Sequence, residues 1–436
     1  MFEGGVNLID FKELSKEKKI EVFPPPAKAV IPLSQHTGIP AKPVVKKGDA
    51  VLKGQLIGEA AGFISSPVHS SISGTVAGLE NRALPTGRSS LSVIVDNNGE
   101  DTSVESMKRD WQILEPKEIV SLVQQAGIVG LGGAAFPTFV KMTIPQGKKA
   151  ECVILNGCEC EPFLTADYRV MKEKGAEVIE GLFIACRALS INKAFVGIES
   201  NKKDIAASIK KLLQHLKATT EIEVRVLPER YPQGSEKHLI KSITGREVPS
   251  GGLPVDVGCV VFNVQTLLSV RDAVCSGTPL IERVLTVTGL VRDTKNLRVR
   301  IGTPLSSILE YCGAETAPGT KLVIGGPMMG INIASPDVPV IKSTTGIIVL
   351  PEEQSLKDEI QSCIRCGKCI DACPMRLVPA ELSRAAESKN WDRCKQFDVA
   401  DCIECGCCSY VCPAKRPMVE LFKWAKTELR KEIPTG

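Results

Sequence analysis

Long apolar runs and an export signal are both missing from this sequence. No apolar stretch in the 436 residues approaches the roughly 18 residues that a membrane-spanning helix needs. The first residues, MFEGGVNLIDFKELSKEKK, do not have the order of a signal peptide, in which basic residues precede an apolar segment. These absences predict a cytosolic protein, or a protein held at a membrane by a partner.

A large excess of charge of one sign is missing as well. The chain has 54 Lys and Arg residues against 50 Asp and Glu residues, a formal net charge of +4, and the charges are evenly spread. A nucleic-acid groove needs basic residues clustered with aromatic ones, so we expect no nucleic-acid partner. The hydrophobic content of 43% in a chain of this length indicates several folded domains rather than disorder.

Cysteine, in contrast, is abundant, with 17 residues. Small secreted domains use cysteines for disulfides, but here ten of the cysteines follow position 362, and eight of those ten have the spacing of metal ligands. The cysteine content therefore predicts metal clusters in a reducing compartment.

The predicted metal ligands form two runs of equal spacing. The first run is Cys363, Cys366, Cys369 and Cys373, followed by Pro374; the second is Cys402, Cys405, Cys408 and Cys412, followed by Pro413. Each run matches the C-x2-C-x2-C-x3-C-P pattern of bacterial two-cluster ferredoxins, in which the fourth cysteine binds the other cluster. We therefore expect two [4Fe-4S] clusters, one held by Cys363, Cys366, Cys369 and Cys412, the other by Cys402, Cys405, Cys408 and Cys373.

Zinc binding is the alternative for these two runs, because C-x2-C pairs also build zinc ribbons. Zinc sites, however, rarely have two such runs with a proline after each. Cys394 and Cys407 lie outside the pattern and are expected to be small packing residues. A third metal site formed by Cys158, Cys160 and Cys152 fits the spacing of no common cluster.

Residues 36–78 alternate short apolar stretches with Gly-Asp, Lys-Gly and Ser-Gly turns, which is typical of a small all-β unit. Its two halves, GDAVLKGQLIGE and PVHSSISGTV, resemble the flattened barrel of biotinyl and lipoyl carrier domains. Carrier domains present a lysine at a hairpin tip, whereas the matching stretch from Ala61 to Ile64 contains none. The resemblance implies the carrier fold without its swinging-arm function, in a domain at residues 1–105.

The middle of the chain has the pattern of α/β structure. Helical periodicity in KEIVSLVQQAG, EVIEGLFIACRAL and DIAASIKKLLQHL alternates with the strand-like runs AECVILNG and KAFVGIES, as in a parallel sheet covered by helices. Residues 297–330 indicate strands, a short helix from about Pro304 and glycine turns, like a β-grasp unit. We place the α/β domain at 106–282, the β-grasp domain at 283–350 and the cluster domain at 351–436. Polar residues 351–359 are the expected linker, and the segment between the cysteine runs is expected to be helical.

Within the α/β domain, the stretch GIVGLGGAAFPT at 127–138 has the G-x-G-x-x-A spacing of a dinucleotide-binding loop between Gly130 and Ala135. A Rossmann loop must follow a strand and open a long helix, with an acid at the end of the next strand. Here a predicted helix precedes the loop, and Pro137 and Pro145 interrupt the segment after it. The Rossmann interpretation fits this context badly, and a purely structural turn is the other alternative.

The loop and the segment NGCECEPFLTAD together resemble the NADH-oxidising flavoprotein subunit of respiratory complex I, in which these elements hold FMN. YPQGSEKHLIKSITGREVPSGGLPVDVGCVVFNVQTLLSV matches a third element of that family in the same order. The resemblance implies that Gly130, Gly132, Gly133 and Lys141 cradle the flavin phosphate and ribityl chain. It also implies that the rest of the FMN site is lined by Asn156, Glu159, Cys160, Gly234, Ser235, Asn263 and Thr266.

The same resemblance gives expectations for the dinucleotide NAD(H). It places Phe136 to stack on nicotinamide or adenine, and Glu161 and Glu236 to face the dinucleotide, although a Phe in this setting is often a packing residue. The sequence departs from that family at Leu131, where Arg is frequent, at Cys158 and Cys160, where acidic and hydroxyl residues are usual, and at Ser235, which replaces an acid. These departures affect the NAD(H) contacts more than FMN binding.

Over nearly its full length the order of parts resembles the RnfC family of the Rnf electron-transport complex, on the stretches FEGGV, QHTGIPAKPVVKKGDAVLKGQ and SSPVHSSISGTV. That family implies a peripheral protein on the cytoplasmic face of the membrane, which exchanges hydride between NAD(H) and FMN. Its two clusters relay single electrons to membrane subunits, and the complex couples electron flow between ferredoxin and NAD+ to translocation of Na+ or H+. Ferredoxin would be reached through another subunit.

Two alternatives to this interpretation remain open. One is a soluble flavin and iron-sulfur reductase subunit, similar to the cobalamin reductases of microcompartments. The other is an electron-transfer scaffold that keeps the fold but does not bind NAD(H), which the residues at Leu131 and Ser235 would permit.

Overall fold

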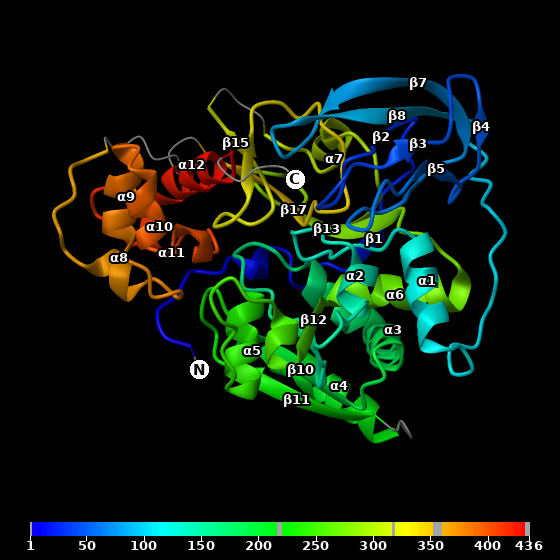
Figure 1. The fold of residues 1–436 in the computed structure, drawn as a ribbon. Helices are drawn as coiled ribbons and strands as arrows, with labels where there is room; N and C mark the ends of the chain where they lie inside the picture. The colour runs from blue at the N-terminus through cyan, green and yellow to red at the C-terminus, as the bar shows by residue number, and fades with distance from the viewer. Residues whose placement is uncertain (1, 216–219, 316–318, 352–359, 432–436) are drawn as a thin grey trace.

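The computed structural model describes residues 2–215, 220–315, 319–351 and 360–431. Figure 1 shows a β-rich module in blue at one end and a helical module in orange and red at the other, with α/β and β-grasp modules between them. The structure thus has the predicted combination of a barrel-sandwich, a flavoprotein-like α/β unit, a β-grasp unit and a helical cysteine module. The expected linker falls almost entirely on residues 352–359, which lie outside the described residues.

The barrel-sandwich module consists of two facing sheets. One sheet has the order β2-β8-β7-β4, with β2 (Lys28–Pro32), β4 (Ala50–Val51), β7 (Gly74–Ala83) and β8 (Ser89–Asn97), and the other has the order β3-β5-β6, with β3 (Lys42–Pro43), β5 (Leu56–Glu59) and β6 (Val68–His69). Side chains such as Ile31, Ile57 and Val95 are fully buried between them. At the lysine-free tip, Phe63 contacts Phe139 of the α/β module at a ring distance of 5.9 Å, so the tip lies against a neighbour.

The α/β module is built on a parallel sheet with the order β11-β10-β9-β12. Its strands are β9 (Cys152–Gly157), β10 (Lys193–Glu199), β11 (Glu221–Leu227) and β12 (Cys259–Asn263), and its helices are α1 (Pro116–Gln125), α2 (Thr138–Met142), α3 (Ala166–Ala188), α4 (Lys203–His215), α5 (Glu236–Thr244) and α6 (Val264–Ser276). Helix α3 begins at Ala166, well before the stretch that periodicity predicted, and its backbone leaves the helical region at Lys174. This interruption changes which side chains share a face of the helix, so the apolar periodicity predicted only the part of α3 that follows Lys174.

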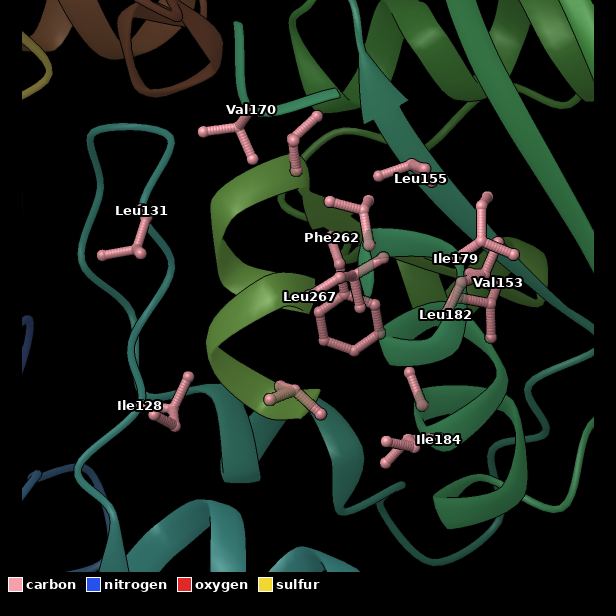
Figure 2. Packing of buried hydrophobic residues seen from close by; sticks show 14 of the residues in the cluster. Ile128, Leu131, Val153, Leu155, Val170, Ile179, Leu182, Ile184, Phe262 and Leu267 are labelled. Atoms are coloured by element: carbon pink, nitrogen blue, oxygen red, sulfur yellow. The ribbon is translucent and has the colours of Figure 1, made fainter. Parts of the chain in front are cut away.

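Both faces of this sheet are covered, as the near-continuous apolar strands require. Val153 and Leu155 of β9 point into the larger core with α3 and α6, while Ile154 points to the opposite face against Leu239 and Ile240 of α5. Figure 2 shows Phe262 beside Leu267 in the larger core, with Ile179 and Leu182 of α3 near Val153. The core fixes β9 and β12 side by side, with Asn156 paired to Asn263 where the two strands end.

The β-grasp module has a mixed sheet with the order β1-β14-β13-β17-β15-β16. It consists of β1 (Ile20–Val22), β13 (Glu282–Gly289), β14 (Lys295–Arg300), β15 (Lys321–Ile324), β16 (Ile331–Ile333) and β17 (Gly346–Leu350), with helix α7 (Leu305–Tyr311). Strand β1 comes from the N-terminal segment and pairs in parallel with β14. The N-terminal segment is therefore shared between modules that are distant in the sequence.

The cysteine module repeats one backbone design twice. Helices α8 (Lys368–Asp371) and α9 (Pro379–Glu387) follow the first run, α11 (Cys407–Tyr410) and α12 (Met418–Lys431) follow the second, and α10 (Trp391–Gln396) lies between them. Arg365 and Gly367 have positive φ angles in the first run, as do Glu404 and Gly406 at the matching positions of the second. Turns of this kind fold three cysteines around one point, as a cluster-binding loop requires.

Three modules meet at the buried ammonium group of Lys342. Its Nζ donates to the carbonyl oxygens of Pro67 in the barrel, at 3.0 Å, and of Gly127 in the α/β module, at 2.7 Å. Gly127 has φ +66°, and a Cβ there would lie 2.5 Å from the Pro67 oxygen, so glycine is required at this contact. Burial lowers the pKa of Lys342 from 10.5 to about 7, because the charged form is not solvated there.

This junction gives a prediction about pH and stability. Between pH 7 and 10.5 the folded protein binds fewer protons at Lys342 than the unfolded chain does, so the free energy of unfolding should rise with pH in this window. Relative to Lys342→Met, the wild-type protein should gain roughly 1 kcal/mol per pH unit above neutrality, measured by urea unfolding. Lys47→Met, at an exposed position, is the control, and equal slopes for Lys342→Met and wild type would contradict the prediction.

Candidate functional site

The main candidate site is a cavity of about 380 Å³ at the carboxyl ends of β9 and β12. Strand β10 follows β9 in the sequence and pairs on one side of it, whereas β12 is added later on the other side. The cavity therefore lies at the switch point of the sheet. Crevices at such points are the usual ligand sites of open α/β sheets. The N-termini of α3, α5 and α6 also reach the cavity, at Asp167, Glu236 and Thr266. The partial positive charge at these helix N-termini favours an anionic ligand.

The glycine loop forms one wall and is not a Rossmann turn. Helix α1 precedes it, and α2 after it has five residues. The loop closes as a hairpin in which the Gly130 N–H donates to the Phe136 oxygen at 2.8 Å, and the Ala135 N–H donates to the Gly130 oxygen at 3.1 Å. The Leu131 N–H donates to Thr266 Oγ1 at 2.9 Å, which fixes the loop to α6. The helix predicted ahead of the loop is therefore confirmed.

Most of the residues that the sequence pointed to as cofactor-binding line this one cavity. They are Gly130, Gly132, Phe136, Lys141, Asn156, Glu159, Cys160, Glu161, Gly234, Ser235, Glu236, Asn263 and Thr266. Gly133 is absent from the lining; it has φ +116°, and a Cβ there would meet nothing within 4 Å. Leu131 is buried in the main core rather than facing the cavity, so the departure at this position changes core packing instead of the wall.

The amides of Asn156 and Asn263 hold the walls together. Asn156 Nδ2 donates to the Gly234 oxygen at 2.8 Å, and its Oδ1 accepts from the Cys158 N–H at 3.1 Å. Asn263 Oδ1 caps α6, and its Nδ2 donates to Asp167 Oδ2 at 2.6 Å. Burial raises the pKa of Asp167, although hydrogen bonds from Gln265 and Asn263 oppose this. Both asparagines thus shape the cavity through bonds within the chain.

A cation and an anion meet inside the cavity. Lys141 Nζ lies 2.6 Å from Glu236 Oε1 and 3.2 Å from the Val261 oxygen. The two side chains are about one third exposed, 29% and 36%, so the pair remains accessible to a ligand. A phosphate that reached Lys141 would compete with the Glu236 carboxylate for the ammonium group.

Two carboxyl groups of the NGCECEP segment face different surroundings. Glu159 accepts from the N–H groups of Asp167 and Tyr168 at the start of α3, at 2.9 and 3.3 Å, and burial raises its pKa. Glu161 accepts from the Met328 N–H at 3.1 Å, and burial raises its pKa to about 7. The buried side chain of Lys12 contacts the same segment, and its Nζ donates to the backbone carbonyl oxygens of Glu161 and Leu164. Burial lowers the pKa of Lys12.

The cysteines of the two runs gather at two separate places. Cys363, Cys366, Cys369 and Cys412 line a cavity of about 470 Å³, and Cys373, Cys402, Cys405 and Cys408 line a much smaller one of about 20 Å³. These are the crossed groups that the spacing predicted, with the fourth cysteine of each run beside the three of the other. In the described residues, no group of His, Cys, Asp or Glu converges closely enough to hold a single metal ion. Four cysteines grouped in this crossed way are the ligands expected for a four-iron cubane, in which each thiolate binds a different iron.

The smaller cysteine cavity lies next to the cavity of the α/β module. Ile403, between two cysteines of the second run, lines both cavities. The Tyr231 hydroxyl lies 2.8 Å from the Cys405 oxygen and 3.3 Å from Glu161 Oε1. One residue therefore contacts a wall of the first cavity and the backbone of a predicted cluster ligand.

Several lining residues were not anticipated from the sequence: Asp167, Tyr231, Gln265, Met329, Thr345 and Ile403. Asp167 had a signal, because it ends the segment NGCECEPFLTAD and is an acid in the first turn of α3, where the helix N-terminus favours one. Tyr231 and Gln265 lie within the third segment that the sequence pointed to. Met329, Thr345 and Ile403 come from other modules, and no local pattern marks them. Cys394 and Cys407 are fully buried packing residues, as expected.

Family models match four parts of the chain. They are the RnfC barrel sandwich hybrid domain at residues 1–100, the Nuo51 FMN-binding domain at 123–272, the SLBB domain at 284–332 and a 4Fe-4S dicluster domain at 362–415. The chain therefore has an FMN-binding domain and an iron-sulfur domain.

Three relatives are similar over nearly the whole chain. The C subunit of the proton-translocating ferredoxin:NAD(+) oxidoreductase complex of Clostridium ljungdahlii is 43% identical over 91% of this chain and 86% of its own. Its counterpart in the Na(+)-translocating complex of Acetobacterium woodii is 42% identical over 90% and 89%. The counterpart in the ion-translocating oxidoreductase complex of Rhodobacter capsulatus is 42% identical over 98% and 82%.

Among solved structures, the NAD+-reducing [NiFe]-hydrogenase in its H2-reduced state superposes with a TM-score of 0.53 at 17% identity, over 74% of this chain and 64% of that one. This likeness concerns the fold alone. In the described residues, none of the helices combines the length and apolar character that crossing a bilayer takes.

The Lys141–Glu236 pair gives a prediction about anion binding. In Glu236→Gln, the ammonium group loses its carboxylate competitor, so apoprotein should bind FMN about two- to fivefold more tightly, in line with a pair worth under about 1 kcal/mol. Fluorescence quenching of FMN measures the change. Glu247→Gln, which breaks the exposed pair with Lys241 outside the cavity, is the control. Weaker FMN binding by Glu236→Gln would show that the carboxylate supports the ligand instead.

Proposed function

Because this chain belongs to the RnfC family of the ion-translocating ferredoxin:NAD+ oxidoreductase (Rnf) complexes, we propose that it exchanges hydride with NAD(H) at a bound FMN. Two [4Fe-4S] clusters then relay single electrons to the membrane subunits of the complex. The observation that carries the proposal is the contact between the α/β cavity and the second cysteine group, which share Ile403 as a lining residue. A two-electron site and a one-electron site are thus neighbours.

The residues present fit FMN. At Gly130 and Gly132 no side chain covers the loop backbone, so an anion can approach it closely, and Lys141 supplies a positive charge. The N-termini of α5 and α6 add partial positive charge from the other side. When bound, FMN supplies the conversion between two-electron and one-electron transfer. The chain's own residues bind it, orient it and close it off from water with Tyr231 and Ile403.

The residues for NAD(H) are proposed on narrower support. Phe136 lines the cavity with part of its surface exposed, which suits stacking on a nicotinamide or adenine ring. Glu236 pairs with Lys141 inside the cavity. The Glu161 carboxyl group, in contrast, already accepts hydrogen bonds from the Met328 N–H and the Tyr231 hydroxyl. A scaffold that has lost NAD(H) binding is the second candidate, favoured by the engagement of Glu161 within the chain.

The wider role of the chain is proposed from its family. We propose that it sits at the cytoplasmic face of the membrane as a peripheral subunit, and that the coupling of electron flow to Na+ or H+ translocation resides in the whole complex. Electrons pass between ferredoxin and this chain through another subunit. The soluble-reductase alternative predicts a protein that purifies without membrane partners.

Anaerobic titration with NADH tests the proposal. The purified chain with FMN and iron-sulfur should lose flavin absorbance on addition of NADH, and reduced-cluster signals should appear in EPR spectra. The electrons found on the flavin and on the clusters should add up to two for each NADH oxidised. A flavin that stays oxidised would favour the scaffold candidate.

Iron content tests the crossed ligand groups. Wild-type protein should contain about eight iron atoms per chain, and Cys412→Ala should lose about four. Combining Cys412→Ala with Cys363→Ala should lose no more, because both residues are assigned to one cluster, whereas Cys412→Ala with Cys402→Ala should lose all of them. Cys394→Ala, a buried cysteine outside both groups, is the control. The opposite pattern for the two double variants would overturn the crossed assignment.

A further inference from the structure

We propose that residues Phe2–Val6, here called the N-terminal strap, together with Tyr231, form a positioning element that holds the second cysteine group against the α/β cavity. This inference rests on the proposed function, because it assigns the element the task of fixing the distance between flavin and cluster. The strap runs between the cysteine module and α5, as the dark blue segment in Figure 1 shows. It contacts both the cysteine module and the α/β module.

The strap is hydrogen-bonded to both modules through its backbone. The Gly5 N–H donates to the Ala372 oxygen at 3.0 Å, next to the predicted cluster ligand Cys373. Val6 and Tyr231 exchange two backbone hydrogen bonds, each of 2.9 Å. A bonded connection thus runs from the cysteine module through the strap to the residue that lines the cavity.

The two glycines of the strap have no room for side chains. Gly4 has φ +73°, and a Cβ there would lie 2.5 Å from the Cys373 oxygen. Gly5 has φ +78°, and its Cβ would lie 2.5 Å from the Tyr231 oxygen. Real Cβ atoms do not approach backbone this closely, so any side chain here must move the cysteine ligand or Tyr231.

Further contacts anchor the strap beyond its glycines. The Phe2 ring meets the His238 ring edge-on at 4.6 Å, and His238 Nε2 lies 3.0 Å from the oxygen of Pro374, the residue after Cys373. A buried apolar cluster at the contact contains Val6, Tyr231, Ala372, Cys405 and Cys407. The contact between the two modules is therefore apolar at its centre and hydrogen-bonded at its edge.

Tyr231 completes the element from the side of the cavity. Its hydroxyl reaches the Cys405 oxygen, while its backbone holds Val6. Electron tunnelling slows steeply with distance, so a small displacement of the cysteine module away from the cavity would slow transfer to the nearby cluster. It would affect the exchange of hydride in the cavity far less, since the strap lines no part of that cavity and, among the described residues of the cysteine module, Ile403 alone lines it.

The test compares Gly4→Ala with Gly99→Ala in the full-length protein carrying FMN and iron-sulfur. Gly99 has φ +79°, but a Cβ there would meet nothing within 4 Å, so it controls for backbone strain without the clash. After mixing with NADH, flavin bleaching in Gly4→Ala should match wild type, while cluster reduction should be slower by about tenfold or more. Gly99→Ala should match wild type in both phases.

A second readout is independent of turnover. Hydrogen exchange in the absence of NADH should be faster in Gly4→Ala at the amides of Gly5, Val6 and Tyr231, which pair across the contact. Unchanged exchange and unchanged cluster reduction would overturn the positioning role. If wild-type flavin does not react with NADH, the proposed function fails, whereas the exchange result still decides whether the strap holds the modules together.

Tyr231→Phe covers the case in which Gly4→Ala does not fold. This variant keeps the ring and the backbone bonds to Val6 and removes the hydroxyl that reaches Cys405. We expect slower cluster reduction, measured relative to flavin reduction in the same sample, with iron content unchanged. Cluster reduction at the wild-type rate in Tyr231→Phe would exclude the hydroxyl from the positioning element.

Discussion

The pairing of β9 with β12 is the constraint on which the site depends. It brings Asn156 opposite Asn263 at the carboxyl ends of two strands that are separated by β10, β11 and several helices in the sequence. From these two positions, amide groups bind Gly234 on one side and Asp167 on the other, so the cavity walls are fixed by the sheet rather than by the loops. The apolar cores on both faces hold this pairing in place. Substitutions far from the cavity therefore affect its shape wherever they loosen the sheet.

The sequence was informative where chemistry is local. Cysteine runs carry their own geometry, because each ligand loop is a few residues long, and the two groups found together are those that spacing predicted. The glycine loop was correctly separated from a Rossmann turn by its neighbours, and nearly all the expected cavity residues line one cavity. Gly133, whose Cβ position points to open space, is the expected glycine that does not line this cavity.

Contacts between distant segments could not be predicted. Lys12 bonds the Glu161 carbonyl across 149 positions, and β1 completes a sheet whose other strands begin after residue 281. No periodicity in the N-terminal residues marks either contact, because the partners come from other modules. The start of α3 was also missed, since the irregular backbone at Lys174 shifts the register of its apolar side chains. A contact of the barrel module was not predicted either. Thr37 donates hydrogen bonds to the backbone oxygens of Ala134 and Ala135, so the barrel supports the glycine loop.

The two halves of the cysteine module share a backbone design but differ in their surroundings. Cys366 of the first group is exposed and its cavity is wide, whereas the second group is enclosed by the α/β module and the N-terminal residues. In the protein with both proposed clusters bound, dissolved oxygen or a chelator would therefore meet the first cluster before the second. Damage to the protein in air would begin at the outer cluster and release iron in two stages, leaving the inner cluster as the last redox centre beside the flavin cavity.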